Sequence, residues 1–281
     1  MKTMPAHHRP ISAAQVRSLQ NAVYRYFGSH RRDLPWRRIA DPYCIYVSEV
    51  MLQQTQVDRV ARKFPAFIRR FPDWESLAKA PLSAVLAAWQ GLGYNRRAKF
   101  LKSAAEEVVG RFCGTLPSDP VDLATLPGIG AATAASIAAF GFNRPTVFIE
   151  TNIRSVFIHR FFPGRRSVDD AELLPLVEQA LDRRHPARWY SALMDYGTAL
   201  KRVEDNPARR SRHHVRQSRF EGSQRQVRGM VVRQLLAAPG MTASALASVI
   251  GRPLARVADA VRALGDEGMM ERRGRRLYIR S

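Results

Sequence analysis

The feature that most limits the possible folds is a glycine-rich turn at residues 126–130, with the sequence Leu-Pro-Gly-Ile-Gly. A short helical pattern precedes it, and a run of small residues from Ala131 predicts a second helix. Two glycines one residue apart let the backbone approach a ligand closely, and amide groups at a helix N-terminus attract an anion. The sequence therefore predicts two tightly packed helices whose connection binds a phosphate through Gly128, Ile129, Gly130 and Thr133.

The surrounding pattern is helical as well. From residue 12 to 200, apolar residues recur at spacings of three and four, for example at Val50, Val57, Val60 and Phe64. Prolines separate these segments, and the alternation typical of strands is missing from this stretch. We expect an all-α domain of about ten short helices over residues 16–200, preceded by a flexible tail at residues 1–15.

The net charge of +21 indicates a polyanionic partner, with nucleic acid first and an anionic membrane second. A genome rich in guanine and cytosine is the alternative source of so much arginine. No basic helix carries the strong apolar face that membrane docking needs, and no run approaches the ~18 apolar residues of a membrane span. The first residues lack the apolar core of a secretory signal. We expect a cytoplasmic, nucleoid-associated protein.

The C-terminal part has a different composition. Residues 201–223 are basic and poor in core-forming residues, which indicates a linker or surface loop able to contact phosphate. Residues 224–281 predict three helices, the second capped by Thr242, followed by a hairpin that turns at Gly274. This order resembles a winged helix. The predicted wing carries a cluster of four arginines, which predicts DNA contacts: Arg272, Arg273, Arg275 and Arg276. The alternative is a module that only packs on the first domain.

Several motifs in order along residues 20–200 resemble the HhH-GPD superfamily of base-excision DNA glycosylases, most closely its A/G-specific adenine glycosylase branch. They are R-D-L-P-W-R at 32–37, S-E-V-M-L-Q-Q-T-Q at 48–56, W-Q-G-L-G-Y at 89–94 and M-D-Y-G at 194–197. The resemblance implies an all-α helix–hairpin–helix fold, with a six-helix barrel at about 42–147, that acts as a monomer on double-stranded DNA.

The resemblance also implies roles for single residues. Glu49 would be the general acid that protonates the departing base, an effect that contributes ~10²–10⁴-fold to the rate. Gln54 and Tyr94 would wedge into the duplex and hold the flipped state. Five residues would border the base pocket: Arg32, Leu34, Trp36, Arg37 and Asp195.

The chain departs from the family at four places. The aspartate that steadies the positive charge on the sugar is replaced by Glu150, which keeps the charge but reaches one methylene further, with Asn152 as a supporting residue. Ala132 occupies the position of the lysine that lyases use, which predicts a monofunctional enzyme. The cysteines that bind a [4Fe–4S] cluster after M-D-x-G are missing, so we expect no metal or other cofactor. The winged-helix-like module stands where relatives carry a domain that recognises 8-oxoguanine.

The sequence thus favours a monofunctional DNA glycosylase that removes a mismatched or damaged base, with adenine opposite 8-oxoguanine or guanine as the leading substrate. Removal of a mismatched thymine or uracil is the alternative within this class. A non-catalytic protein that binds damaged DNA is the alternative outside it, because of the exchange at Glu150. A transcriptional regulator built on the C-terminal module would leave about 200 residues unexplained.

Overall fold

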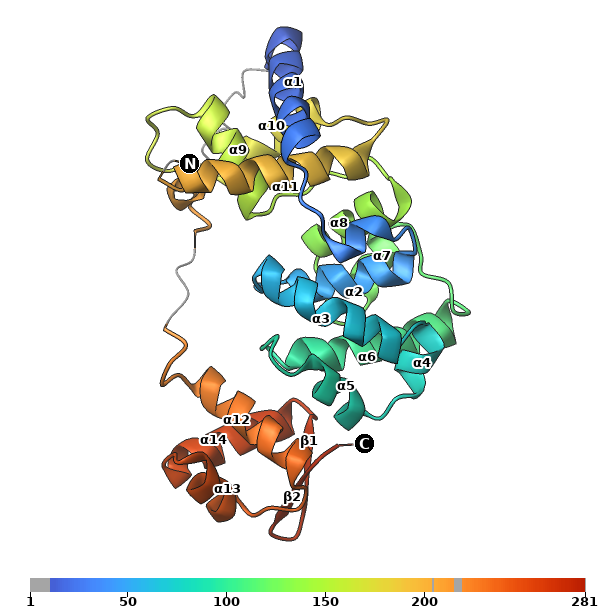
Figure 1. The fold of residues 1–281 in the computed structure, drawn as a ribbon, viewed down its shortest axis with the longest axis vertical. Coiled ribbons are helices and arrows are strands. Elements are labelled where there is room, and N and C mark those ends of the chain that lie inside the picture. Colours follow the sequence, from blue (N-terminus) through green and yellow to red (C-terminus); the bar gives the residue numbers. More distant parts are fainter. Residues whose placement is uncertain (1–10, 204, 215–218, 281) are drawn as a thin grey trace, which may run out of the picture. The chain divides into compact units, whose positions relative to one another are not determined.

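The computed structural model describes residues 11–203, 205–214 and 219–280. Over these residues the chain forms fourteen α-helices, two short 3-10 helices and one two-stranded sheet (Figure 1). Their contacts divide the chain into two compact units. Unit 1 comprises Met1–Leu34, Ser118–Val121 and Gly130–Arg216, and unit 2 comprises Pro35–Pro117, Asp122–Ile129 and Gln217–Ser281. Residues 1–10 of the predicted tail lie outside the described residues.

Unit 1 contains α1 (Ala13–His30), α8 (Ala131–Phe142), α9 (Thr151–Phe161), α10 (Asp170–Ala180) and α11 (Pro186–Val203). Helix α1 begins where the Ser12 side chain accepts a hydrogen bond from Gln15 N, and the Gln15 side chain bonds back to Ser12 N. Helices α9 and α11 lie side by side (Figure 1). The core of this unit includes the fully buried aromatic residues Phe157, Trp189 and Tyr190.

The chain after α11 folds back onto unit 1. The 3-10 helix η2 (Pro207–Arg210) packs on α9, and Ser211 forms a bridge with Val168. Arg210 Nη1 donates to Phe162 O at 2.9 Å. The part of the predicted linker at residues 205–212 therefore packs against the helical domain, whereas residues 204 and 215–218 lie outside the described residues.

Unit 2 is built around the 3-10 helix η1 (Pro35–Arg38) and five helices. These are α2 (Pro42–Leu52), α3 (Val57–Arg70), α4 (Trp74–Lys79), α5 (Leu82–Trp89) and α6 (Arg96–Arg111). Helix α2 begins sharply because Asp41 caps it and Pro42 occupies its first position. Apart from Ser48 and Glu49, its residues are apolar or aromatic, and eight of its residues are buried.

The predicted pair of helices around the glycine-rich turn is present. Helix α7 (Pro120–Thr125) leads into the turn, and α8 starts directly after Gly130. Gly128 has a positive φ of 78°, and a Cβ there would lie 2.8 Å from the Phe100 side chain. Only glycine meets both demands, which accounts for the first glycine of the turn.

The C-terminal elements of unit 2 are α12 (Gln224–Ala237), α13 (Ala243–Ile250), α14 (Leu254–Asp266) and a hairpin of β1 (Met270–Arg273) and β2 (Arg276–Ile279). The hairpin turns where predicted, with Arg273 paired to Arg276. Thr242 caps α13 as predicted, accepting from Ala245 N at 3.2 Å. Helix α12 contacts α5, and the Lys99 ammonium donates to Glu267 O. Among the described residues, every helix is too short or too polar to span a bilayer.

Candidate active site

Glu150 lies at the N-terminus of α9 and caps it. Its Oε1 accepts from the backbone amides of Asn152 at 2.7 Å and Ile153 at 3.0 Å, and its Oε2 accepts from Asn152 Nδ2 at 3.0 Å. Burial raises the pKa of Glu150, while these hydrogen bonds and the charge of Lys201 act in the opposite direction. The carboxylate that the sequence singled out is therefore held in one orientation by its own helix.

The side chain of Asn152 links Glu150 to α11. Asn152 Oδ1 accepts from Lys201 Nζ at 2.7 Å, and Thr198 Oγ1 lies 3.3 Å from the same atom. The two helices approach closely because α11 has Gly197 at the crossing, where a Cβ would lie only 2.4 Å from Asn152 O. Sequence reasoning selected Asn152 but missed Lys201, which no motif distinguishes from the other basic residues near it.

Two predicted pocket residues form an ion pair in unit 1. Arg32 donates to Asp195 through its backbone N at 3.1 Å and through Nε at 2.5 Å, and Asp195 is 2% exposed. This pair fixes the segment after α1 on α11, next to buried Leu34. In unit 2, Trp36 is buried with its ring against Phe64, and Arg37 is partly buried in η1.

Glu49 lies in α2 of unit 2 and is the one charged residue of that helix. It is partly buried, and its chain neighbours Ser48 and Val50 are 1% and 4% exposed.

The two predicted wedge residues share an unusual backbone conformation in unit 2. Gln54 and Tyr94 have φ of 53° and 47°, values that side-chain-bearing residues seldom adopt. Gln54 lies in the loop after α2 and Tyr94 in the loop before α6, and both of these wedge loops contact the buried guanidinium of Arg97. It donates to backbone oxygens on either side and to one hydroxyl: Val50 O, Met51 O, Gln53 O, Leu92 O, Gly93 O and Thr55 Oγ1. Arg97 therefore joins the wedge loops, a role that sequence reasoning missed.

The glycine-rich turn lies beside the first wedge loop. Gln53 Nε2 donates to Gly128 O at 3.4 Å within unit 2. Gly128 and Gly130 are exposed, and Thr133 is half-buried in the first turn of α8. Ile129 differs from the other predicted phosphate-binding residues, because its side chain is buried and its amide already donates to Leu126 O at 3.1 Å.

Comparison with known proteins identifies relatives of this arrangement. Residues 47–175 match the HhH-GPD superfamily of base excision DNA repair proteins. The adenine DNA glycosylase of Mycolicibacterium smegmatis is 34% identical over 238 residues, which cover 74% of this chain and 76% of that protein. The chain belongs to the HhH-GPD superfamily, on its adenine glycosylase branch.

Other relatives match a smaller share of their own length. The adenine DNA glycosylase of Buchnera aphidicola is 36% identical over 185 residues, and the human one is 30% identical over 210. The chain spans 52% and 38% of these two proteins. Among solved structures, a thermostable thymine-DNA glycosylase superposes with a TM-score of 0.58 at 25% identity, covering 66% of this chain and 86% of that one. An endonuclease III–DNA complex at 15% identity shares the fold.

Outside the HhH-GPD motifs, the C-terminal module also touches a predicted site residue. Arg225 Nη1 of α12 donates to Tyr94 Oη at 2.5 Å, and its guanidinium lies 5.6 Å from the Tyr94 ring centroid. The four arginines of the hairpin are exposed. Two of them have contacts within the module, because Arg273 pairs with Glu271 at 2.5 Å and Arg276 donates to Gly240 O at 3.0 Å.

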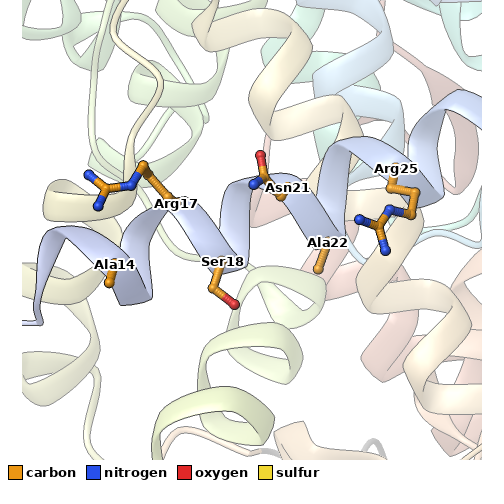
Figure 2. A pocket seen from close by; sticks show the side chains of 6 residues that line it. All are labelled: Ala14, Arg17, Ser18, Asn21, Ala22 and Arg25. Carbon is orange, nitrogen blue, oxygen red and sulfur yellow. The ribbon is translucent and has the colours of Figure 1, made fainter.

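A pocket lies on α1 of unit 1, and the predicted site residues do not line it. Figure 2 shows its six lining side chains on one helix, including Arg17, Ser18 and Arg25, and none of them was predicted as a site residue. Over the part of the chain that the structure describes, no three His, Cys, Asp or Glu side chains gather as metal ligands. The two cysteines, buried Cys44 and exposed Cys113, do not fit the four-cysteine cluster of relatives.

Proposed function

We propose that the protein removes adenine from duplex DNA by hydrolysing the N-glycosidic bond, with 8-oxoguanine or guanine as the opposing base. The observation that carries this proposal is the 34% identity to an adenine DNA glycosylase across 74% of the chain, together with carboxylates at both family positions. The proposed partner is double-stranded DNA, bound by a monomer. The proposed location is the cytoplasm, in association with the nucleoid.

The two carboxylates have separate tasks in the proposed reaction. As the bond between the sugar C1′ and the base nitrogen breaks, its electrons pass to the base, and Glu49 donates a proton to the base. The ionised carboxylate of Glu150 stabilises the positive charge left on the sugar, because its two oxygens are already oriented by Asn152 and Ile153. A water molecule then bonds to C1′ and passes its proton to the carboxylate of Glu49, which restores the acid for the next cycle.

The reaction is proposed to stop at the abasic site. A lyase needs an amine that forms a Schiff base with the sugar, and the family position for that amine holds Ala132, an exposed residue at the start of α8. The four-cysteine cluster has no part in the proposed mechanism, since the chain offers only two cysteines.

DNA is proposed to lie against three surfaces. The amides around Gly128 and Gly130 would hold a phosphate, while Gln54 and Tyr94 would enter the duplex. The third is the winged-helix-like module at 224–281, whose exposed hairpin arginines would contact the backbone: Arg272, Arg273, Arg275 and Arg276.

A panel of labelled duplexes tests the proposal under single-turnover conditions. It includes adenine, thymine and uracil opposite guanine, adenine opposite 8-oxoguanine, and matched pairs, each treated with alkali to cleave abasic sites. We expect release of adenine, loss of release in Glu49→Gln, and no effect of Glu75→Gln, which changes an exposed glutamate of α4. Strand breakage without alkali would contradict a monofunctional enzyme.

The same panel decides a second candidate, removal of mismatched thymine. The 25% identity to a thymine-DNA glycosylase over 66% of the chain favours it over other bases. Release of thymine in place of adenine would establish that activity. Tight binding without release from any duplex would instead indicate a protein that binds damaged DNA and does not cut it.

A further inference from the structure

We infer that Lys201 is a positioning residue for the proposed reaction: through Asn152 it orients the Glu150 carboxylate and places a positive charge beside it. The inference rests on the proposed function, because it assumes that Glu150 stabilises the sugar cation. It concerns residues of α9 and α11, which pack on one another within unit 1.

The hydrogen bonds run in one direction. A lysine ammonium only donates, so the side-chain atom of Asn152 that faces Lys201 must be the acceptor Oδ1. The amide donor Nδ2 is then turned toward Glu150 Oε2, 3.0 Å away. Thr198 does not supply the same constraint, because its single hydroxyl proton has a shorter bond to Met194 O at 2.7 Å. Lys201 therefore fixes, from the side of α11, the same orientation of the Asn152 amide that the Glu150 carboxylate requires.

The other cations near this group already have carboxylate partners. Arg154 donates to both oxygens of Asp170, at 2.8 and 2.6 Å, and Arg32 is paired with Asp195. Lys201 and Glu150 instead interact with each other through space. Burial lowers the pKa of Lys201 and Glu150 raises it, while Lys201 lowers the pKa of Glu150.

A glutamate at this position has a particular need for such support. It has one more rotatable bond than the aspartate of relatives, so more freedom must be removed before its oxygens occupy fixed positions. Gly197 permits the close approach of α11 to Asn152, and Lys201 follows one helical turn later on the same face. The small residue and the lysine thus act together to fix the longer carboxylate.

The test compares Lys201→Met, which keeps the length but neither donates nor carries charge, with Lys201→Arg, which keeps both properties. Arg202→Met, an exposed neighbour on α11, is the matched control. Single-turnover base release is followed from pH 5 to 9, and affinity is measured with a duplex whose target nucleotide is fluorinated at C2′ and resists cleavage.

We expect Lys201→Met to slow release on the order of 10–100-fold, as misplacement of a reacting group does, with affinity within about twofold of the wild type. The acid limb of the rate profile moves to higher pH, since Glu150 then loses the charge that favours its ionised form. Lys201→Arg regains most of the rate, and Arg202→Met behaves as the wild type.

An unchanged rate and pH profile in Lys201→Met would overturn the inference. So would a slow variant with an unshifted acid limb, because that result describes a purely structural lysine. If the wild type releases no base, the proposed function has failed, and ¹³C titration of the Glu150 carboxyl in both proteins tests the coupling alone. An upward shift of its pKa in Lys201→Met supports the inference, and an equal pKa refutes it.

Discussion

Replacement of Arg97 by methionine gives the sharpest test of how the wedge loops are held. The Arg97 guanidinium donates to Val50 O and Met51 O at 2.8 Å each and to Gln53 O at 2.6 Å. Val50 and Met51 belong to the last turn of α2, where helix geometry leaves carbonyls without intrahelical donors. Both residues are buried, so water cannot easily replace the lost donor.

The expected loss follows from these carbonyls. A buried acceptor left without a donor costs about 1–3 kcal/mol, and two depend on Arg97 in this way. Part of this cost is offset because the variant no longer buries a charge, and burial lowers the pKa of Arg97 to about 10. We expect Arg97→Met to lower the free energy of unfolding by about 3 kcal/mol. Arg97→Lys should lose somewhat less, because an ammonium has three donors for six acceptors.

Urea unfolding followed by tryptophan fluorescence measures this loss. The control is Arg96→Met, since Arg96 precedes Arg97 in the same helix but is exposed, with its guanidinium 5.0 Å from the Phe100 ring centroid. The control should change stability by no more than about 0.5 kcal/mol. Equal stability of the two methionine variants would refute the idea that Arg97 holds the loops of Gln54 and Tyr94 together.

Three further outcomes follow from the structure. Gly197→Ala should destabilise the protein by about 1–3 kcal/mol and slow base release, because a Cβ there meets Asn152 O. Gly28→Ala should not destabilise the protein, because a Cβ there meets nothing within 4 Å, and thermal unfolding measures both variants. A double-mutant cycle of Arg225→Met and Tyr94→Phe, measured as free energies of unfolding in urea, should give a coupling energy of about 0.5–1 kcal/mol. A coupling energy of zero would show that the C-terminal module does not stabilise the Tyr94 side chain. With ~6–10 phosphate contacts, affinity for duplex DNA should fall ~10³–10⁵-fold between about 50 and 200 mM salt, and a flat response would contradict DNA binding through phosphates.

The helical pattern, the caps and the turns could be predicted because they depend on residues close together in the chain. Thr242 and Gly274 are such cases, since a cap or a hairpin turn is decided within a few residues. Arg96 and Arg97 show the limit of this reasoning. They are identical neighbours in sequence, yet one is exposed and the other is buried under two loops that begin far apart in the chain. Only the tertiary packing distinguishes them.

The same limit applies to the segment after α11, where composition indicated a loop and the structure shows packing. Ser155 Oγ lies 3.3 Å from Asn206 Oδ1, and η2 packs on α9. Helix α9 is therefore held by α11 along one side and by η2 along another, and it presents Glu150 from its N-terminus. In this chain, hydrogen bonds and packed side chains secure the helix that bears the carboxylate. Support by packing explains how the longer Glu150 is kept in a defined orientation, because each hydrogen bond to its carboxylate comes from Asn152 or Ile153 of that same secured helix.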